Sequence, residues 1–239
     1  MRNPDRWRPT RFVEAAGGWR ASSDAGDVAP GSRHTADLLA QCYAPALRAY
    51  ARGRLLDLGC GNVPLYEMYR PGITTAVCVD WPSSYHGHAH VDVACDLNQP
   101  IPFAASSFDT IILSDVLEHL FDYETVWSEM ARLLRPSGKL ILGVPFLYWL
   151  HEEPYDHFRP TEFALRRYCE RHGFRVISLA PYGGALDVIF DISAKHLGVS
   201  AILGNAFYWV GRAILPLGRR LLARTERKFP LGYLLVAER

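Results

Sequence analysis

An acidic side chain followed by two glycines gives the clearest chemical signal in this sequence. Asp57 interrupts the apolar run Leu55–Leu58, and Gly59 and Gly61 follow it. A buried strand that ends in a glycine turn lets the backbone approach a ligand that a Cβ atom would block. Because a carboxylate at the strand end attracts a cation and repels a pyrophosphate, the stretch predicts a pocket for a positively charged ligand.

Three histidines later in the chain are candidate general bases: His119, His151 and His157. The imidazole pKa lies near neutral pH, which suits removal of a proton from a hydroxyl. For His119 the alternative is a histidine that only packs a helix. For the segment that holds the other two, the alternative is a polar loop held together by Asp156 and Arg159.

Strand and helix patterns alternate along the chain and must position these groups. This alternation predicts an α/β fold with a parallel, doubly wound sheet. Pro45 predicts a kink in the first helix or its division into two. The apolar spacing after Asn62 predicts a helix after the glycine turn. We expect strands over 54–58, 75–80, 91–93, 108–113, 139–144, 173–179 and 233–239, and helices over 35–50, 122–134 and 161–171.

The octamer Leu55–Asn62 resembles the cofactor loop of class I S-adenosylmethionine-dependent methyltransferases. The segment Ser114–Leu120 is similar to one in the type 11 methyltransferase family. The stretch His151–Thr161 resembles one in a bacterial subgroup, many of whose members act on sugars or secondary metabolites. The resemblance implies a Rossmann-like sheet of seven strands, mostly parallel, whose last strand is antiparallel and lies between the fifth and sixth.

The same resemblance implies roles for individual residues. Asp80, 19 residues after Gly61, resembles the acid that holds a ribose, and Asp96 the acid that accepts from the adenine amino group. Val63 stands where a third glycine often occurs, at a position that we expect to be helical already. The residues expected to bind S-adenosylmethionine are Asp57, Gly59, Cys60, Gly61, Asp80, Trp81, Asp96, Leu97, Ser114 and Val116; those expected to bind the acceptor are His151, Tyr155, Asp156 and Arg159.

The composition of the first residues predicts an arm, and the resemblance implies the rest of the domain organisation. Residues 1–34 form an irregular N-terminal arm, and residues 35–239 form the methyltransferase domain, in which 186–230 is a helical insertion before the last strand. The part 186–224 is apolar and helical in pattern, and three roles for it stay open. It covers the substrate pocket, forms the face of a homodimer, or lies on a membrane surface.

Composition narrows the partners and the compartment. The 239 residues carry 26 basic and 25 acidic side chains, which gives no electrostatic case for a nucleic-acid partner. Five cysteines without paired spacing and an N-terminus without an apolar segment indicate a cytoplasmic protein. His86, His88 and His90 alternate as metal ligands can, but we interpret them as incidental loop histidines and expect no metal centre.

Together these features predict methyl transfer from S-adenosylmethionine to a small-molecule acceptor. The histidine-rich rim favours O-methylation of a hydroxyl on a sugar or a natural product of secondary metabolism. A scaffold that binds the cofactor without turnover is one alternative, and a membrane-associated lipid methyltransferase is another. A dehydrogenase or epimerase with a nicotinamide cofactor is a third.

Overall fold

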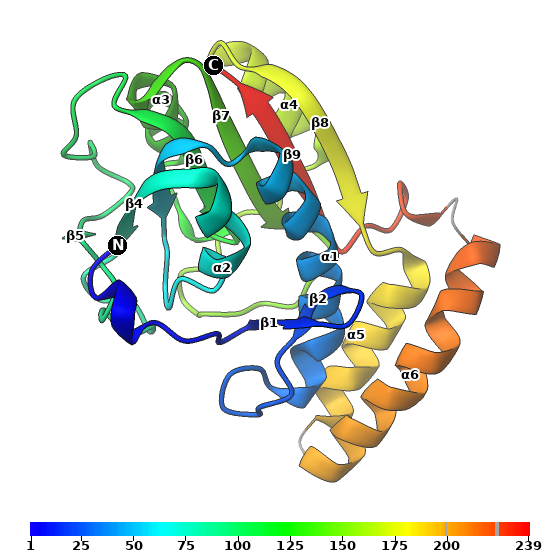
Figure 1. The fold of residues 1–239 in the computed structure, drawn as a ribbon. Coiled ribbons are helices and arrows are strands. Elements are labelled where there is room, and N and C mark those ends of the chain that lie inside the picture. Colours follow the sequence, from blue (N-terminus) through cyan, green and yellow to red (C-terminus); the bar gives the residue numbers. More distant parts are fainter. Residues whose placement is uncertain (199, 223–224) are drawn as a thin grey trace.

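The computed structural model describes residues 1–198, 200–222 and 225–239 around a seven-stranded sheet (Figure 1). The strand order is β5-β4-β3-β6-β7-β9-β8. The pairs among β5, β4, β3, β6 and β7 are parallel, whereas β9 is antiparallel to both its neighbours. The predicted fold class is confirmed. The strands are β3 (Gly53–Leu58), β4 (Ile73–Asp80), β5 (Val93–Ala94), β6 (Phe108–Ser114), β7 (Leu134–Pro145), β8 (Arg175–Tyr182) and β9 (Gly232–Glu238).

Helices cover both faces of this sheet and enclose two apolar cores (Figure 1). Helices α1 (Arg33–Tyr50) and α2 (Tyr66–Tyr69) bury Tyr43 and Tyr69 on one face. Helices α3 (Tyr123–Leu133) and α4 (Glu162–Arg171) bury Trp127 and Leu165 on the other. Helix α1 runs through Pro45 as one helix of 18 residues, so the expected division into two helices is wrong. The buried residues around the proline, Tyr43, Ala46 and Leu47, hold the helix against the sheet.

Two helices begin at side-chain caps that the sequence supplies. The Thr161 hydroxyl accepts a hydrogen bond from the Ala164 amide at 3.3 Å, and the Asp122 carboxylate accepts one from the Thr125 amide at 3.2 Å. Each cap satisfies an amide that has no partner inside its helix. The predicted starts of α3 and α4 therefore agree with the structure.

The N-terminal arm is more ordered than we expected. It contains an antiparallel hairpin of β1 (Phe12–Ala15) and β2 (Gly18–Ala21), where Gly17 and Gly18 have φ angles of 93° and 127°. The Ala21 amide donates to Asp37 of α1 at 2.8 Å, which fixes the hairpin on that helix. The prediction of an irregular arm is wrong there, because glycines with positive φ allow the tight turn. Short 3-10 helices span Pro4–Arg6, Pro30–Ser32, Arg70–Gly72 and Leu117–His119.

A helical pair separates β8 from β9, as the insertion prediction requires. Helices α5 (Ala185–Leu197) and α6 (Ala201–Leu222) lie side by side at the end of α1 (Figure 1). Thr35 donates to Asp191 at 2.6 Å, and the Tyr208 hydroxyl donates to Asp37 at 2.7 Å. Among the residues described, no helix is long and apolar enough to cross a membrane.

Candidate functional site

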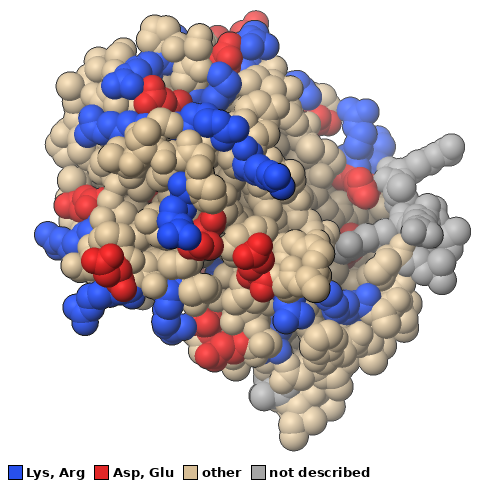
Figure 2. Space-filling view, in the orientation of Figure 1, with Lys and Arg blue, Asp and Glu red and all other residues tan. Residues whose placement is uncertain are grey.

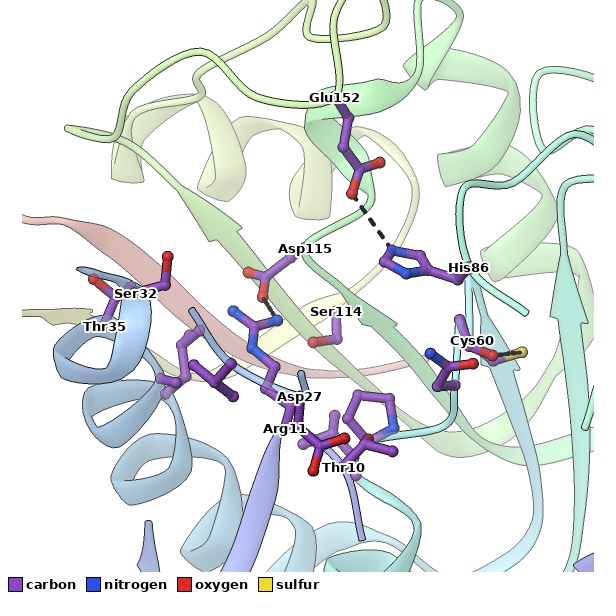
Figure 3. A pocket seen from close by; sticks show the side chains of 18 of the residues that line it. Thr10, Arg11, Asp27, Ser32, Thr35, Cys60, His86, Ser114, Asp115 and Glu152 are labelled. Atoms are coloured by element: carbon purple, nitrogen blue, oxygen red, sulfur yellow. Dashed lines mark hydrogen bonds and ion pairs between the residues drawn. The ribbon is translucent and has the colours of Figure 1, made fainter. Parts of the chain in front are cut away.

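The candidate site is a cavity of about 650 Å³ at the carboxyl ends of β3, β6 and β7. Open α/β sheets bind ligands at this edge. The N-terminal arm and the start of α1 form one wall, and the loops after β3, β4, β6 and β7 form the others (Figure 3). No described residue of α5 or α6 lines the cavity, so the lining gives no support to pocket cover, one of the three roles left open for 186–224. Those helices support α1 instead.

The turn after β3 has the close backbone approach that the glycines predict. Gly59 has φ of 69°, and a Cβ atom there would collide with the Val116 side chain. Gly61 has φ of 51° and lies against His86. Both glycines and the Cys60 between them line the cavity. Position 59 requires glycine because its φ is positive and because a Cβ atom has no room beside Val116.

Val63 completes this turn in an unexpected conformation. Its φ of 53° lies in the left-handed region, which a β-branched residue rarely adopts. We expected an ordinary helical position, so that expectation is wrong. The Val63 carbonyl accepts a hydrogen bond from the Trp7 indole at 3.1 Å, and its amide donates to the Cys60 carbonyl at 2.8 Å. These contacts on both sides hold the strained residue in place.

Asp57 supplies a buried carboxylate to the cavity. Its side chain is buried, and the Tyr69 hydroxyl donates to one oxygen at 3.2 Å. Burial raises the pKa of Asp57 to about 7, with the negative charge of Asp80 adding to the effect and the Tyr69 hydrogen bond opposing it. A cationic ligand group that replaced the lost water would favour the ionised form.

Asp80 supports the glycine turn from behind the cavity. One oxygen of its carboxylate accepts from the Gly61 amide at 2.9 Å, and the other accepts from the Trp81 amide at 2.7 Å. Asp96 accepts from the backbone and side chain of Asn98. The expected cofactor residues Asp80, Trp81, Asp96, Leu97 and Val116 do not line the cavity, whereas Asp57, Gly59, Cys60, Gly61 and Ser114 do.

Imidazoles and carboxylates also line this cavity and lie close to one another. The His119 Nε2 atom lies 3.8 Å from Glu118 Oε1, and His151 Nε2 lies 3.7 Å from that same oxygen. Glu152 lies 3.8 Å from His119 and 3.4 Å from His86, which reaches toward it in Figure 3. Burial raises the pKa of Glu118, and the partner His86 lowers the pKa of Glu152.

The loop after β7 positions His151 through its own ion pair. Arg159 binds the Asp156 carboxylate, and that carboxylate accepts from the His151 amide at 3.0 Å. Burial opposes the charged form of His151, but Glu118 and Asp156 outweigh it, so its pKa is raised. Of the expected acceptor-side residues, His119 and His151 line the cavity, and Tyr155, Asp156, His157 and Arg159 do not.

Several cavity residues were not among the sequence predictions. Arg11 from the arm forms an ion pair with Asp115 at 3.2 Å (Figure 3). No pattern in the arm indicated that Arg11 reaches the site. Glu118 and Glu152 are next to His119 and His151 in the sequence, and this adjacency could have indicated that they belong to the site. His86 belongs to the histidine loop that we interpreted as incidental.

Comparison with known proteins assigns the family. Residues 32–179, more than half of the chain, match the family model of a methyltransferase domain. The chain belongs to that family. This membership confirms the predicted class, whose methyl donor is S-adenosylmethionine. The type 11 subgroup stays a prediction.

A curated methyltransferase is similar in sequence to a shorter part of this chain. An uncharacterized methyltransferase of Mycobacterium sp. (strain KMS) is 34% identical over 99 residues, which cover 39% of this chain and 36% of the relative. The match thus spans about a third of the length of that curated relative.

Two solved structures are similar in fold. The [4+2]-cyclase SpnF has a TM-score of 0.57 at 18% identity and covers 87% of this chain and 82% of its own. A putative methyltransferase from Bacillus halodurans has a TM-score of 0.54 at 16% identity and covers 84% and 98%. At these identities the likeness shows the fold alone.

Proposed function

We propose that this protein transfers a methyl group from S-adenosylmethionine to a hydroxyl of a small polar acceptor, a sugar or a natural product of secondary metabolism. One observation carries the proposal. The Asp57 carboxylate and the glycine turn share a cavity with the imidazoles of His119 and His151. A site for a cationic donor and a set of proton acceptors thus lie within one enclosure.

The residues present fit the donor. The sulfonium group, when bound, supplies an electrophilic methyl group. Asp57 offers a buried charge for the amino group of the donor, and the turn at Gly59 presents backbone where a Cβ atom has no room. Placing the acceptor in line with the methyl group supplies several kcal/mol of the barrier reduction.

The acceptor hydroxyl must lose a proton as its oxygen forms the new bond to carbon. The carbon–sulfur bond breaks, and its electron pair stays on sulfur. His119 and His151 are the candidate bases inside the cavity, whereas His157 is exposed and lies 6.4 Å from the ring of Phe121. We keep Tyr155, Asp156 and Arg159 as residues that shape the acceptor side through the loop after β7.

Methyl transfer from labelled S-adenosylmethionine to a panel of sugars and phenolic or polyketide hydroxyls tests the proposal. We expect an ether product by mass spectrometry and a loss of turnover in Asp57→Asn. His196→Gln is the matched control, because that histidine is exposed on α5 and distant from the cavity lining. Products methylated only on nitrogen or carbon would overturn the O-methylation.

The scaffold alternative has its own readout. A protein that binds the donor without turnover would take up S-adenosylhomocysteine and release no product with any acceptor. The family assignment leaves no support for the nicotinamide alternative. Binding of S-adenosylhomocysteine raises the unfolding free energy by about 2.7 kcal/mol at a hundred times its dissociation constant, which a melting curve detects.

A second candidate function is supported by the exposed apolar face of α5 and α6. We define the α6 stripe as Ile202, Leu203, Trp209, Val210 and Ile214, with exposed fractions of 53–82%. Because clustered exposed apolar side chains mark interaction surfaces, the stripe supports a lipid acceptor held at a membrane surface, or a homodimer that buries it. Vesicle flotation and sedimentation of the protein alone separate these two. We keep the cytoplasm as the expected compartment.

A further inference from the structure

Three ligating side chains from two loops converge at the acceptor end of the cavity. Glu118 and His119 follow β6, and His151 follows β7. One ligand atom from each lies within 4.8 Å of the other two. We propose that these three residues bind a divalent transition-metal ion, with Glu152 beside them as a further ligand. The ion would hold the acceptor oxygen and favour loss of its proton to water, so His119 and His151 would then serve as ligands in place of acting as bases. This inference rests on the proposed methyl transfer.

The two imidazoles are already oriented as metal ligands. The Nδ1 atom of His119 lies 2.9 Å from the Tyr155 carbonyl oxygen. Since a carbonyl oxygen only accepts, Nδ1 carries a proton, and in the neutral imidazole Nε2 therefore has the free electron pair that a metal ion would bind. The Nδ1 atom of His151 lies 3.2 Å from Asp156 Oδ2 and 3.3 Å from the Trp149 carbonyl oxygen, so the same reasoning applies. Metal-binding histidines ordinarily have such a carbonyl or carboxylate behind them.

The carboxylate between these imidazoles has no hydrogen bond. The Glu118 side chain is completely buried, and neither of its oxygens has a hydrogen-bond partner among the described residues. Its nearest polar neighbours are the two Nε2 atoms, at 3.7 and 3.8 Å. A buried carboxylate is costly unless it is paired or coordinates a metal. A divalent ion among the three groups would compensate Glu118 directly.

The spacing of the ligand atoms is close to that of a real centre. Ligand atoms around a tetrahedral ion with bonds of about 2.1 Å lie about 3.4 Å apart. Glu118 Oε1 lies 3.7 and 3.8 Å from the two Nε2 atoms, and all three ligand atoms lie within 4.8 Å of one another, so the side chains would have to move inward to bind an ion. Two imidazoles and a carboxylate favour Zn²⁺, Fe²⁺ or Mn²⁺ over Mg²⁺, and leave further positions open for oxygen atoms of an acceptor.

The charge of the surroundings supports a cation at this place. The described residues that line the cavity include five carboxylates, those of Asp27, Asp57, Asp115, Glu118 and Glu152, and three arginines, of which Arg11 pairs with Asp115 and Arg8 with Asp27. An acceptor with two neighbouring oxygens, such as a vicinal diol or a hydroxyketone, could bind the ion through both. We therefore infer a chelating acceptor rather than an isolated hydroxyl.

The test measures binding of Mn²⁺ to the chelator-treated protein by the loss of the free-ion electron paramagnetic resonance signal. We expect one equivalent bound, displaced by Zn²⁺. Glu118→Gln and His151→Gln should each weaken Mn²⁺ binding at least tenfold, while His196→Gln leaves it unchanged. Circular dichroism checks that each variant is folded, and the two variants on separate loops keep the test valid if one of them unfolds.

The outcomes separate this inference from the proposed function. No stoichiometric Mn²⁺ or Zn²⁺, or full affinity in folded Glu118→Gln, overturns the metal site even if methyl transfer is found. Turnover that is unchanged after exhaustive chelation overturns it as well. Stoichiometric Mn²⁺ without uptake of S-adenosylhomocysteine would support the metal site and overturn the proposed function.

Discussion

At the scale of residues, two aspartates with similar sequence contexts have different positions and contacts in the structure. Asp57 and Asp80 both end strands, and we expected both to contact the cofactor. The structure places Asp57 in the lining of the cavity, while the carboxylate of Asp80 accepts hydrogen bonds from two backbone amides and lies outside that lining. The spacing of the acids predicts which residues reach the sheet edge. It does not predict which side chain enters the cavity, because that depends on how the following turn folds back.

Replacing Gly59 with alanine should damage the cofactor end of the cavity. The φ of 69° and the Val116 side chain both oppose a Cβ atom there. We expect Gly59→Ala to lower the free energy of unfolding by about 2–4 kcal/mol and to weaken S-adenosylhomocysteine binding. Urea unfolding and calorimetry measure these two effects. Gly87→Ala is the control, since φ there is not positive, and an equal loss in both variants would contradict the explanation.

The pKa of Asp57 predicts how donor binding depends on pH. Burial, aided by the charge of Asp80, raises this pKa to about 7 in the free protein. Below that pH the carboxyl group takes up a proton and no longer attracts the amino group of the ligand. The affinity for S-adenosylhomocysteine should therefore fall about tenfold from pH 8 to pH 6.

Calorimetry over this pH range, with chelator present, measures the dependence. Asp57→Asn has no charge to titrate, so its weaker binding should change little with pH. A wild-type affinity that is flat between pH 6 and pH 8 would show that Asp57 does not carry the interaction.

At the scale of elements, the spacing of apolar residues predicted the strands and long helices of the sheet better than it predicted the short turns. The antiparallel strand 233–239 and the capped helix at Thr161 appear in the structure as β9 and α4. The hairpin at Gly17 was missed, although paired glycines between apolar residues are a known signal. Helix α2 has only four residues, because Pro71 follows it in the Arg70–Gly72 segment.

Asp37 on α1 joins three elements, and its removal should loosen them together. Its carboxylate accepts from the Ala21 amide of β2 and from the Tyr208 hydroxyl of α6, and it lies 3.3 Å from Arg212. We expect Asp37→Ala to lower the free energy of unfolding by about 3 kcal/mol, because buried donors lose their acceptor.

Denaturant unfolding measures this loss, and Asp5→Ala, an exposed aspartate in the arm, serves as the control with a change within about 0.5 kcal/mol. A loss below 1 kcal/mol in Asp37→Ala would contradict a linking role for this residue.

At the scale of the whole molecule, the site is built from segments far apart in the sequence. The family resemblance predicted the β3 turn and the loops after β6 and β7, which the cavity unites. It gave no indication of Arg11, because the arm reaches the cavity through long-range contacts with α1 and with the turn at Val63. Charges of both signs mix over the visible face, and the lower end of the helical pair carries few of them (Figure 2).

We expect the α6 stripe to be needed for binding to vesicles or to a second copy of the chain, and to contribute little to folding stability. We expect Trp209→Ser combined with Ile214→Ser to abolish binding to anionic vesicles or dimer formation, whichever the wild-type protein shows. The unfolding free energy should change by no more than about 0.5 kcal/mol per site, since both side chains are already more than half exposed.

Flotation and analytical ultracentrifugation report association for the double variant. Phe163→Ser provides the comparison, because Phe163 is 74% exposed on α4, away from the stripe. Equal association of the double variant and the wild type would remove any role for the stripe.

The chain leaves the sheet for α5 and α6 and returns to it at the same place, between the end of β8 and the start of β9. Tyr182 and Gly232 are paired neighbours on β8 and β9, and the Leu231 amide donates to the Tyr182 carbonyl at 3.0 Å. A short reverse turn could therefore bridge these strands without altering their pairing. The sheet and the helical pair are in this sense joined at a single place. A chimaera with a different helical pair would keep the pairing of β8 with β9, and would keep the wall that α1 gives the cavity only if the new helices supplied partners for Thr35 and Asp37.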